Sequence, residues 1–230
     1  MKLLSSALLV SSLLAASAHA GIVIFDDFNR SGPLAGSSTS GPGGSWVGGA
    51  ANYTTTGTLL NIASSGGGGG SYQSISLLTN TTYTLSADLR NNTAGSVDWI
   101  GFGFGTNSGQ VGSGDAVLLE GTGKAYAYEV GSNQGVGYAS DIGLAKGSFS
   151  IVLTTGNTLG ASHVEYFRNG TSFGAYHSTN ASLFTRAFVQ DSATVAGSID
   201  NFTLTATAVP EPSSLLLLSI AGLGLVRRRR

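Results

Sequence analysis

The chain has 230 residues, including 35 glycines and no cysteine. The lack of cysteine excludes disulfides, thiol catalysis and cysteine-ligated metals. Residues 21–208 carry 6 Lys and Arg against 11 Asp and Glu, a net charge of −5 without a basic stripe, so we expect no nucleic-acid partner.

Residues 1–20, "MKLLSSALLVSSLLAASAHA", have the layout of a secretory signal peptide. Lys2 supplies the early positive charge, an apolar run follows, and Ala18 and Ala20 form a small-residue cleavage site. Cleavage by signal peptidase would leave Gly21 as the new N-terminus. The alternative is a buried N-terminal helix, which the order of charge, short apolar core and small residues disfavours.

Residues 21–208 are long enough for one domain with a sizeable core, and their pattern is that of strands. In "TYTLSADL" (82–89) and "FSIVLTT" (149–155) apolar and polar residues alternate, the period of a half-buried antiparallel strand. Many short strands separated by turn signals predict an all-β fold, an antiparallel β-sandwich or jelly roll. Ten further strands are predicted at 22–28, 58–63, 72–77, 97–104, 116–119, 125–130, 163–168, 172–176, 184–189 and 199–207.

Three glycine-containing stretches have local interpretations. Asn169-Gly170 predicts a two-residue type I′ hairpin turn closed by Arg168 and Thr171, because both central residues tolerate positive φ. Residues 64–71, "SSGGGGGS", predict a surface loop. In "GFGFG" (101–105) the glycines are expected to make room in a crowded sheet, and no phosphate loop is predicted.

The tail begins with an extended segment, because Pro210 and Pro212 bias their neighbours away from helix. Residues 213–226 are uncharged and would span about 21 Å as a helix, short of the ~30 Å of a hydrocarbon core. Four arginines follow, which the positive-inside rule keeps in the cytoplasm: Arg227, Arg228, Arg229 and Arg230. This order predicts a hydrophobic helix that stops transiently in the inner membrane.

The tail at 209–230 resembles the PEP-CTERM sorting signal. Its processing motif is Val209, Pro210, Glu211 and Pro212, followed by the apolar 215–226 and the terminal arginines. The resemblance implies recognition by an exosortase in the inner membrane of a Gram-negative bacterium that makes exopolysaccharide. It further implies delivery of the processed protein to the cell surface or extracellular matrix.

Three segments of the body resemble concanavalin A-like, laminin-G or lectin-type jelly rolls: "VIFDDFNR" (23–30), "YFRNGTSFG" (166–174) and "GSIDNFTLTAT" (197–207). The resemblance implies a late aromatic–x–x–Asn–Gly hairpin and pairing between the first and last strands.

Catalytic residues are not predicted in the body. Glycosidases need paired carboxylates, but no E-x-D-x-E motif occurs, Glu120 and Glu129 stand singly, and Asp26 and Asp27 fall on opposite strand faces. A distant pair of carboxylates converging in space stays open. His163 and His177 are expected to come close across the Asn169-Gly170 turn, as polar positions on a solvated face and not as a catalytic or metal site.

Two binding possibilities remain at the residue level. Asp26, Asp27, Asp115 and Asp200 are candidate Ca²⁺ ligands, although Asp26 and Asp200 are favoured as turn caps and no cofactor is required. Seven aromatic residues would stack on sugar rings if exposed. They are Trp46, Trp99, Tyr53, Tyr72, Tyr126, Tyr128 and Tyr138.

The sequence therefore favours an exported, non-catalytic surface or matrix protein associated with exopolysaccharide. A lectin-like carbohydrate-binding module and a polysaccharide-active hydrolase or lyase are the alternatives. A row of exposed aromatic residues would favour the first alternative, and two convergent carboxylates in a cleft the second.

Overall fold

The computed structural model describes residues 20–48, 53–63, 70–106, 113–129, 145–192 and 194–209, and the backbone of 135–140. The predicted signal peptide and the tail beyond Val209, including the sorting helix, lie outside these residues apart from Ala20. Within the described ranges, no helix is long and apolar enough to cross a membrane.

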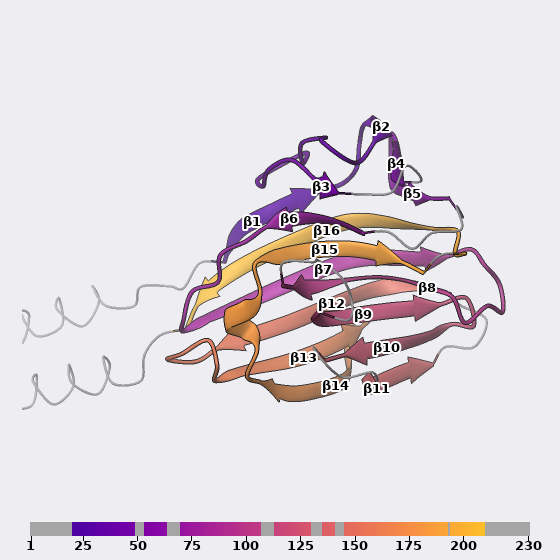
Figure 1. Cartoon of the computed structure of the whole chain (residues 1–230). Coiled ribbons are helices and arrows are strands. Elements are labelled where there is room, and N and C mark those ends of the chain that lie inside the picture. Colours follow the sequence, from indigo (N-terminus) through magenta and orange to yellow (C-terminus); the bar gives the residue numbers. More distant parts are fainter. Residues whose placement is uncertain are drawn as a thin grey trace, which may run out of the picture.

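Two antiparallel sheets form a sandwich, which confirms the predicted all-β fold (Figure 1). One sheet has nine strands. In spatial order they are β14 (Thr171–Ser178), β13 (Ser162–Arg168), β12 (Lys146–Thr155), β7 (Thr81–Asn91), β16 (Gly197–Ala208), β5 (Leu60–Ile62), β4 (Tyr53–Thr56) and β2 (Ser31–Pro33), with β1 (Gly21–Asp26) also paired to β16.

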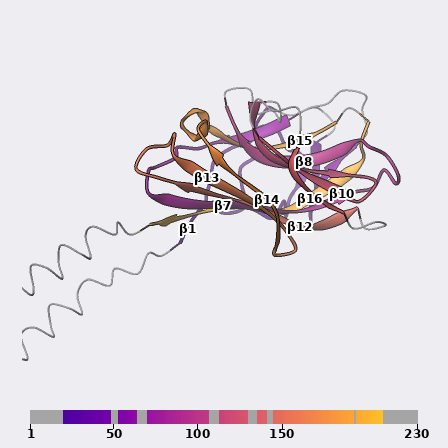
Figure 2. The same ribbon diagram turned by 90° about the horizontal axis from the view of Figure 1, so that it is seen from below.

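The other sheet has seven strands. In spatial order they are β11 (Gly135–Ser140), β10 (Lys124–Tyr128), β9 (Gly114–Glu120), β8 (Trp99–Gly105), β15 (Arg186–Asp191), β6 (Gly70–Ser74) and β3 (Val47–Gly48). A short 3₁₀ turn, η2 (Ala181–Leu183), precedes β15. Figure 2 separates β8 and β15 of this sheet from β7 and β16 of the other.

The first and last strands pair, as the jelly-roll resemblance implies. Gly21 of β1 lies opposite Ala206 of β16, so β1 begins and β16 ends at the same end of the sandwich (Figure 1). The backbone N–H of Val209 donates to the carbonyl of Asn80 at 2.7 Å, which ties the last described residue to the start of β7.

Strict alternation builds the interior. Every second residue of β7 from Thr81 to Asn91 is buried, and β12 buries Phe149, Ile151 and Leu153, as their sequences predict. Phe202 of β16 packs edge-on against Phe102 of β8, with ring centroids 6.3 Å apart, and thereby joins the two sheets.

The glycines of "GFGFG" are required by backbone proximity. A Cβ added at Gly101 would lie 2.3 Å from the carbonyl oxygen of Val117, and one at Gly103 would lie 2.2 Å from that of Asp115. The expected crowding is confirmed, and the nearest atoms at both positions belong to the backbone of β9.

Several strands differ from the prediction. β2, β3, β4 and β11 were not predicted, because they are short or rich in glycine, serine and threonine. β2 and β3 are in addition paired with strands that do not follow them directly in the chain. Gly70 and Ser71 were assigned to a loop, but they begin β6, where Ser71 is buried. The rest of that predicted loop, residues 64–69, lies outside the described residues.

Candidate functional site

The outward surface of the seven-stranded sheet carries a second apolar cluster, separate from the core between the sheets. Ala116, Leu118 and Phe188 are buried there. Four half-buried rings pack against them: Tyr72, Trp99, Tyr126 and Tyr128. We call this surface the aromatic face.

The strand register aligns part of this cluster in one row. Tyr128 of β10 lies opposite Ala116, which lies opposite Gly103, then Phe188, then Tyr72 of β6. With strands about 4.8 Å apart, the two tyrosines stand roughly 19 Å from each other across five strands. The row is therefore of the length of several linked sugar rings.

Charged groups flank the rings of the aromatic face. The guanidinium carbon of Arg186 lies 3.6 Å from the centroid of the Tyr72 ring. At the other side, burial and the neighbouring Glu120 carboxylate raise the pKa of Tyr126. The rings of Tyr126 and Tyr128 meet edge-on at 6.5 Å.

Apolar ring faces beside a few polar groups suit the binding of a pyranose, which has apolar C–H faces and hydroxyl edges. Of the seven aromatic candidates, the structure brings Tyr72, Trp99, Tyr126 and Tyr128 together on this face. Tyr138 is paired with Tyr126 in the backbone register between β11 and β10.

The remaining two candidates, Trp46 and Tyr53, do not meet the condition of exposure, because both are core residues. Trp46 is 1% exposed and donates its indole N–H to Asp26 Oδ2 at 2.7 Å. Tyr53 is also 1% exposed and donates to Asp191 Oδ1 at 2.5 Å, and burial raises its pKa. Each ring joins the interior because its polar atom has a buried carboxylate as partner.

The outward surface of the nine-stranded sheet has a different chemistry. One row across it runs Thr207, Thr82, Thr154, His163 and His177. Thr82 and Thr154 hydrogen-bond through their hydroxyls at 3.2 Å. We call this surface the hydroxyl face, since the outward residues of β7 begin Thr82, Thr84, Ser86.

Asp26 has a structural role, as the turn-cap prediction favoured. It accepts two hydrogen bonds from Arg30 at 2.6 and 2.8 Å, one from Trp46, and one from the backbone N–H of Phe28 at 2.9 Å. These donors occupy both carboxylate oxygens, which leaves Asp26 unsuited to a Ca²⁺ ion. The prediction did not include the hydrogen bonds that Asp26 accepts from the side chains of Arg30 and Trp46.

The other Ca²⁺ candidates do not assemble into a site. Asp200 accepts from the backbone N–H of Asn201 at 2.7 Å, and its pKa is raised by burial and by the charges of Asp88 and Asp27. Asp115 is fully buried in a different sheet. Among the described residues, no three His, Cys, Asp or Glu side chains are grouped to hold a metal. The four candidate aspartates are therefore not gathered at one place in the described part of the chain.

One pair of carboxylates approaches a common tyrosine. Burial raises the pKa of Tyr166 well above its ordinary value, and the charges of Asp115 and Glu129 add to this effect. No sequence pattern indicated this proximity, because Asp115 lies on β9 and Glu129 lies just after β10. Asp115 is fully buried beside Tyr166 and Tyr176, so it does not present its carboxylate to solvent.

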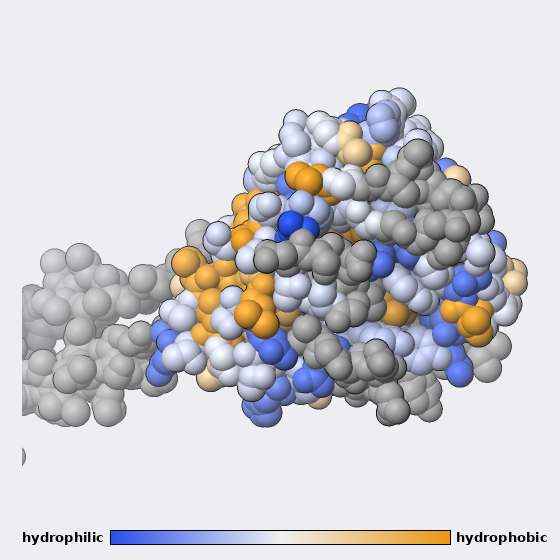
Figure 3. Space-filling model, viewed as in Figure 1, coloured by the Kyte–Doolittle hydropathy of each residue, from blue (hydrophilic) through white to orange (hydrophobic). Residues whose placement is uncertain are grey.

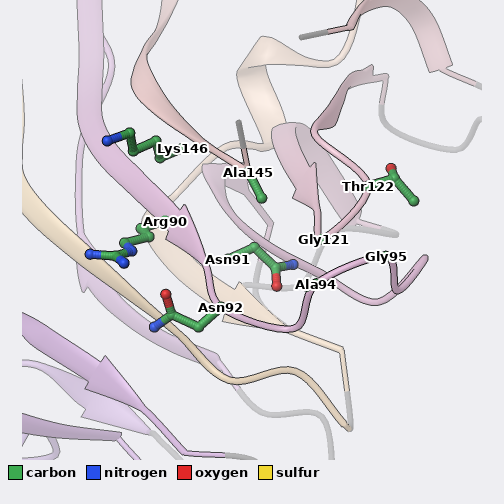
Figure 4. Close-up of a pocket in the computed structure, with 9 residues that line it drawn as sticks. All are labelled: Arg90, Asn91, Asn92, Ala94, Gly95, Gly121, Thr122, Ala145 and Lys146. Atoms are coloured by element: carbon green, nitrogen blue, oxygen red, sulfur yellow. The ribbon is translucent and has the colours of Figure 1, made fainter. Parts of the chain in front are cut away.

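An open cavity of about 590 Å³ lies at the end of β7 away from β1 and Val209. Arg90 and Lys146 lie opposite each other in the register of β7 and β12. Their side chains stand with Asn92 at one side of this cavity, and Thr122 stands at the other (Figure 4).

The opposite end of the molecule is apolar. Four apolar residues are exposed there, with between 40% and 67% of each accessible to solvent: Ile22, Leu78, Leu183 and Val209. The segments that carry them meet where β1 begins and β16 ends. Figure 3 shows apolar residues gathered toward this end. We call it the apolar end.

The hairpin after β13 is confirmed and brings the two histidines together. Asn169 and Gly170 have φ of +50° and +79°, as a type I′ turn requires, and Arg168 pairs with Thr171. His163 lies directly opposite His177, and both are exposed.

Comparison with known proteins agrees with this architecture. Residues 208–230 match the PEP-CTERM protein-sorting motif. The sandwich is similar to the carbohydrate recognition domain of Emp47p, at 10% identity and a TM-score of 0.50, over 81% of this chain and 98% of that one. It is equally similar to the potassium-bound carbohydrate recognition domain of Emp46p, at 9% identity and a TM-score of 0.51, over 72% and 89%. No curated protein matches the sequence.

The structural likeness shows the fold, which is the lectin-type, concanavalin A-like jelly roll that the three body segments resemble. The sorting motif indicates an exported protein and implies processing by an exosortase.

Proposed function

We propose that this chain is an exported, non-catalytic protein of a Gram-negative cell surface or extracellular matrix that binds polysaccharide through its aromatic face. The observation that carries the proposal is the gathering of Tyr72, Trp99, Tyr126 and Tyr128 on one outward surface. Large half-buried rings outside the core are the expected means of stacking on sugars. The lectin-type fold of the sandwich supports the same ligand class.

The two chain ends supply the route to the surface. Signal peptidase would cut after Ala18-His19-Ala20 and leave Gly21, and residues 21–208 would form the exported domain. The exosortase would act at Val209, Pro210, Glu211 and Pro212 while 213–226 stops in the inner membrane. Arg227 to Arg230 would hold the stop on the cytoplasmic side.

The apolar end supports the membrane-held intermediate. Only four residues, 209–212, separate β16 from the uncharged segment 213–226. Four extended residues span at most about 14 Å, so the apolar end must stay close to the bilayer surface. Exposed Leu78 and Leu183 suit that position, because leucine side chains partition into an interface more readily than polar ones.

Binding can be tested with the exported protein and exopolysaccharide isolated from the same bacterium, by affinity gel electrophoresis. Trp99→Ala and Tyr126→Ala should each weaken binding by about tenfold or more, whereas Tyr126→Phe should keep most of it. Thr84→Ala on the hydroxyl face is the matched control and should bind as the parent does. Equal retardation of all four variants would refute the aromatic face as the binding surface.

Processing can be tested by the intact mass of the surface or secreted protein in a host that has the exosortase. The expected product begins at Gly21 and ends within 209–212. Replacing Pro210, Glu211 and Pro212 by alanine should leave the tail attached and the protein in the membrane fraction. A parent product that retains 215–230 would show a permanent anchor instead.

A further inference from the structure

His163 and His177 lie opposite each other because of a β-bulge. Near the turn, Phe167 pairs with Ser172, but Tyr166 pairs with Gly174, so Phe173 is an extra residue on β14. Without this insertion, His163 would lie opposite Tyr176. The bulge sends Tyr176 to the core side and places both histidines on the hydroxyl face.

The two imidazole rings are held at a separation typical of two ligands on one metal ion. Their centroids are 5.3 Å apart and their planes are inclined by 55°. A Zn–N bond of about 2.1 Å and roughly 1.1 Å from nitrogen to ring centre put each centroid ~3.2 Å from the metal. At a tetrahedral angle, the two centroids would then be about 5.2 Å apart.

We propose that His163 and His177 bind one divalent late transition-metal ion, such as Zn²⁺, Ni²⁺ or Cu²⁺, with water at its remaining positions. Imidazole nitrogen is a preferred ligand of these ions, and the site should bind Cu²⁺ more tightly than it binds Zn²⁺ or Ni²⁺. Ca²⁺ and Mg²⁺, which prefer oxygen ligands, should not compete. Both side chains are solvent-exposed, so the ion can enter without a change of fold.

The neighbours of the pair are small or polar. Thr154 lies beside His163 on β12, and Ala175 and Glu165 form the next pair along the hairpin on the same face. The site is thus open above the sheet.

The test is isothermal titration of Zn²⁺ into the full-length chain, purified in detergent without a polyhistidine tag. We expect one ion per chain, and at least tenfold weaker binding in His163→Ala and in His177→Ala. The matched control is the double variant Ala175→His with His177→Ala. It keeps the number of histidines but moves one to a diagonal position about 7–8 Å away, so its binding should also fall at least tenfold.

Urea midpoints of the variants, equal to that of the parent, would show that exposed substitutions leave the fold intact. Zn²⁺ should also bind the urea-unfolded parent at least tenfold more weakly, because the rings are brought together only by the hairpin. Unchanged affinity in the displaced-histidine variant would overturn the proposal. So would one ion per two chains with a Zn²⁺-dependent dimer in sedimentation.

Discussion

The two outward faces of the sandwich are built on the same alternation and yet carry opposite chemistry. On the seven-stranded sheet the outward positions hold Tyr72, Trp99, Tyr126 and Tyr128, whereas on the nine-stranded sheet β7 presents threonine, serine and aspartate. The inward positions of both sheets are equally apolar. The fold therefore fixes the inward residues, whereas many outward positions are less constrained by packing, and the residues that fill those positions indicate function.

The faces also differ in how closely their strands approach. At the outward positions 101 and 103, β8 has glycines that lie against the backbone of β9, while the outward positions of β7 hold side chains of ordinary size. Adding one methyl group at an outward position should therefore lower stability more at the glycines of β8 than at the outward positions of β7.

The largest expected loss of stability comes from a substitution in the hydrophobic core between the two sheets. Phe202→Ala removes a fully buried ring that contacts Trp46 at 5.2 Å and Phe102 at 6.3 Å, one neighbour lying across the sandwich. The free energy of unfolding should fall by about 3–5 kcal/mol. Urea unfolding followed by tryptophan fluorescence measures this. A decrease in the free energy of unfolding of less than about 1 kcal/mol would mean that the Phe202 ring does not join the two sheets in a common core.

An intermediate effect should separate the faces. Gly103→Ala forces a Cβ to within 2.2 Å of the Asp115 carbonyl oxygen, so β8 and β9 must move apart. We expect a loss of about 1–3 kcal/mol. Ser86→Ala, the matched outward position on β7, should change stability by no more than about 0.5 kcal/mol. Equal urea midpoints for the two variants would remove this contrast.

The smallest expected effect is on the pH dependence of stability, to which Asp98 and Asp200 contribute with opposite signs. Hydrogen bonds from Thr194 and Ser96 lower the pKa of Asp98, so its contribution to stability is present above its ordinary pKa of 3.8 and is lost as the pH falls through the lowered value. The pKa of Asp200 is raised by burial and by nearby Asp88. The charged Asp200 carboxylate therefore lowers the free energy of unfolding at pH values above its raised pKa. Acidification through that pKa removes this destabilisation.

Urea unfolding of two variants across the acid range tests these signs. Asp98→Asn should be less stable than the parent at neutral pH and should approach it in strong acid. Asp200→Asn should be slightly more stable at neutral pH, by less than about 0.5 kcal/mol because the site is mostly solvated. Parallel pH curves for the parent and both variants would contradict the assigned shifts.

Local pattern was sufficient for the long strands and the late hairpin. The alternation of β7 and β12 and the Asn169-Gly170 turn are each determined within a dozen residues. Pairing between strands that are not consecutive in the chain was not predictable, so β2 and β3 were missed. β11 pairs with the preceding strand β10, and it was missed because its sequence is rich in glycine. The Phe173 bulge, which alters the register by one residue, lies within the local β13–β14 hairpin and was missed because no residue pattern marked it.

The candidate site, too, was predictable from the sequence only in part. Trp99 and Trp46 were both candidates for sugar stacking, yet Trp99 faces outward and Trp46 is buried against Asp26. Which side of a sheet becomes the interior depends on the strand's neighbours and on the opposing sheet. Sequence could name the aromatic candidates and the sorting motif, whereas only the assembled sheets could select the four that share a face.

The pairing of β1 with β16 has a mechanical consequence. A protein held by its C-terminal tail would carry tension along β16, whose hydrogen bonds to β7 and β1 run perpendicular to the strand. Force along the strand would load many of these bonds at once in shear, instead of peeling them one by one. We therefore expect the body to resist pulling from the tail more strongly than pulling on β14, an edge strand that would unzip from β13.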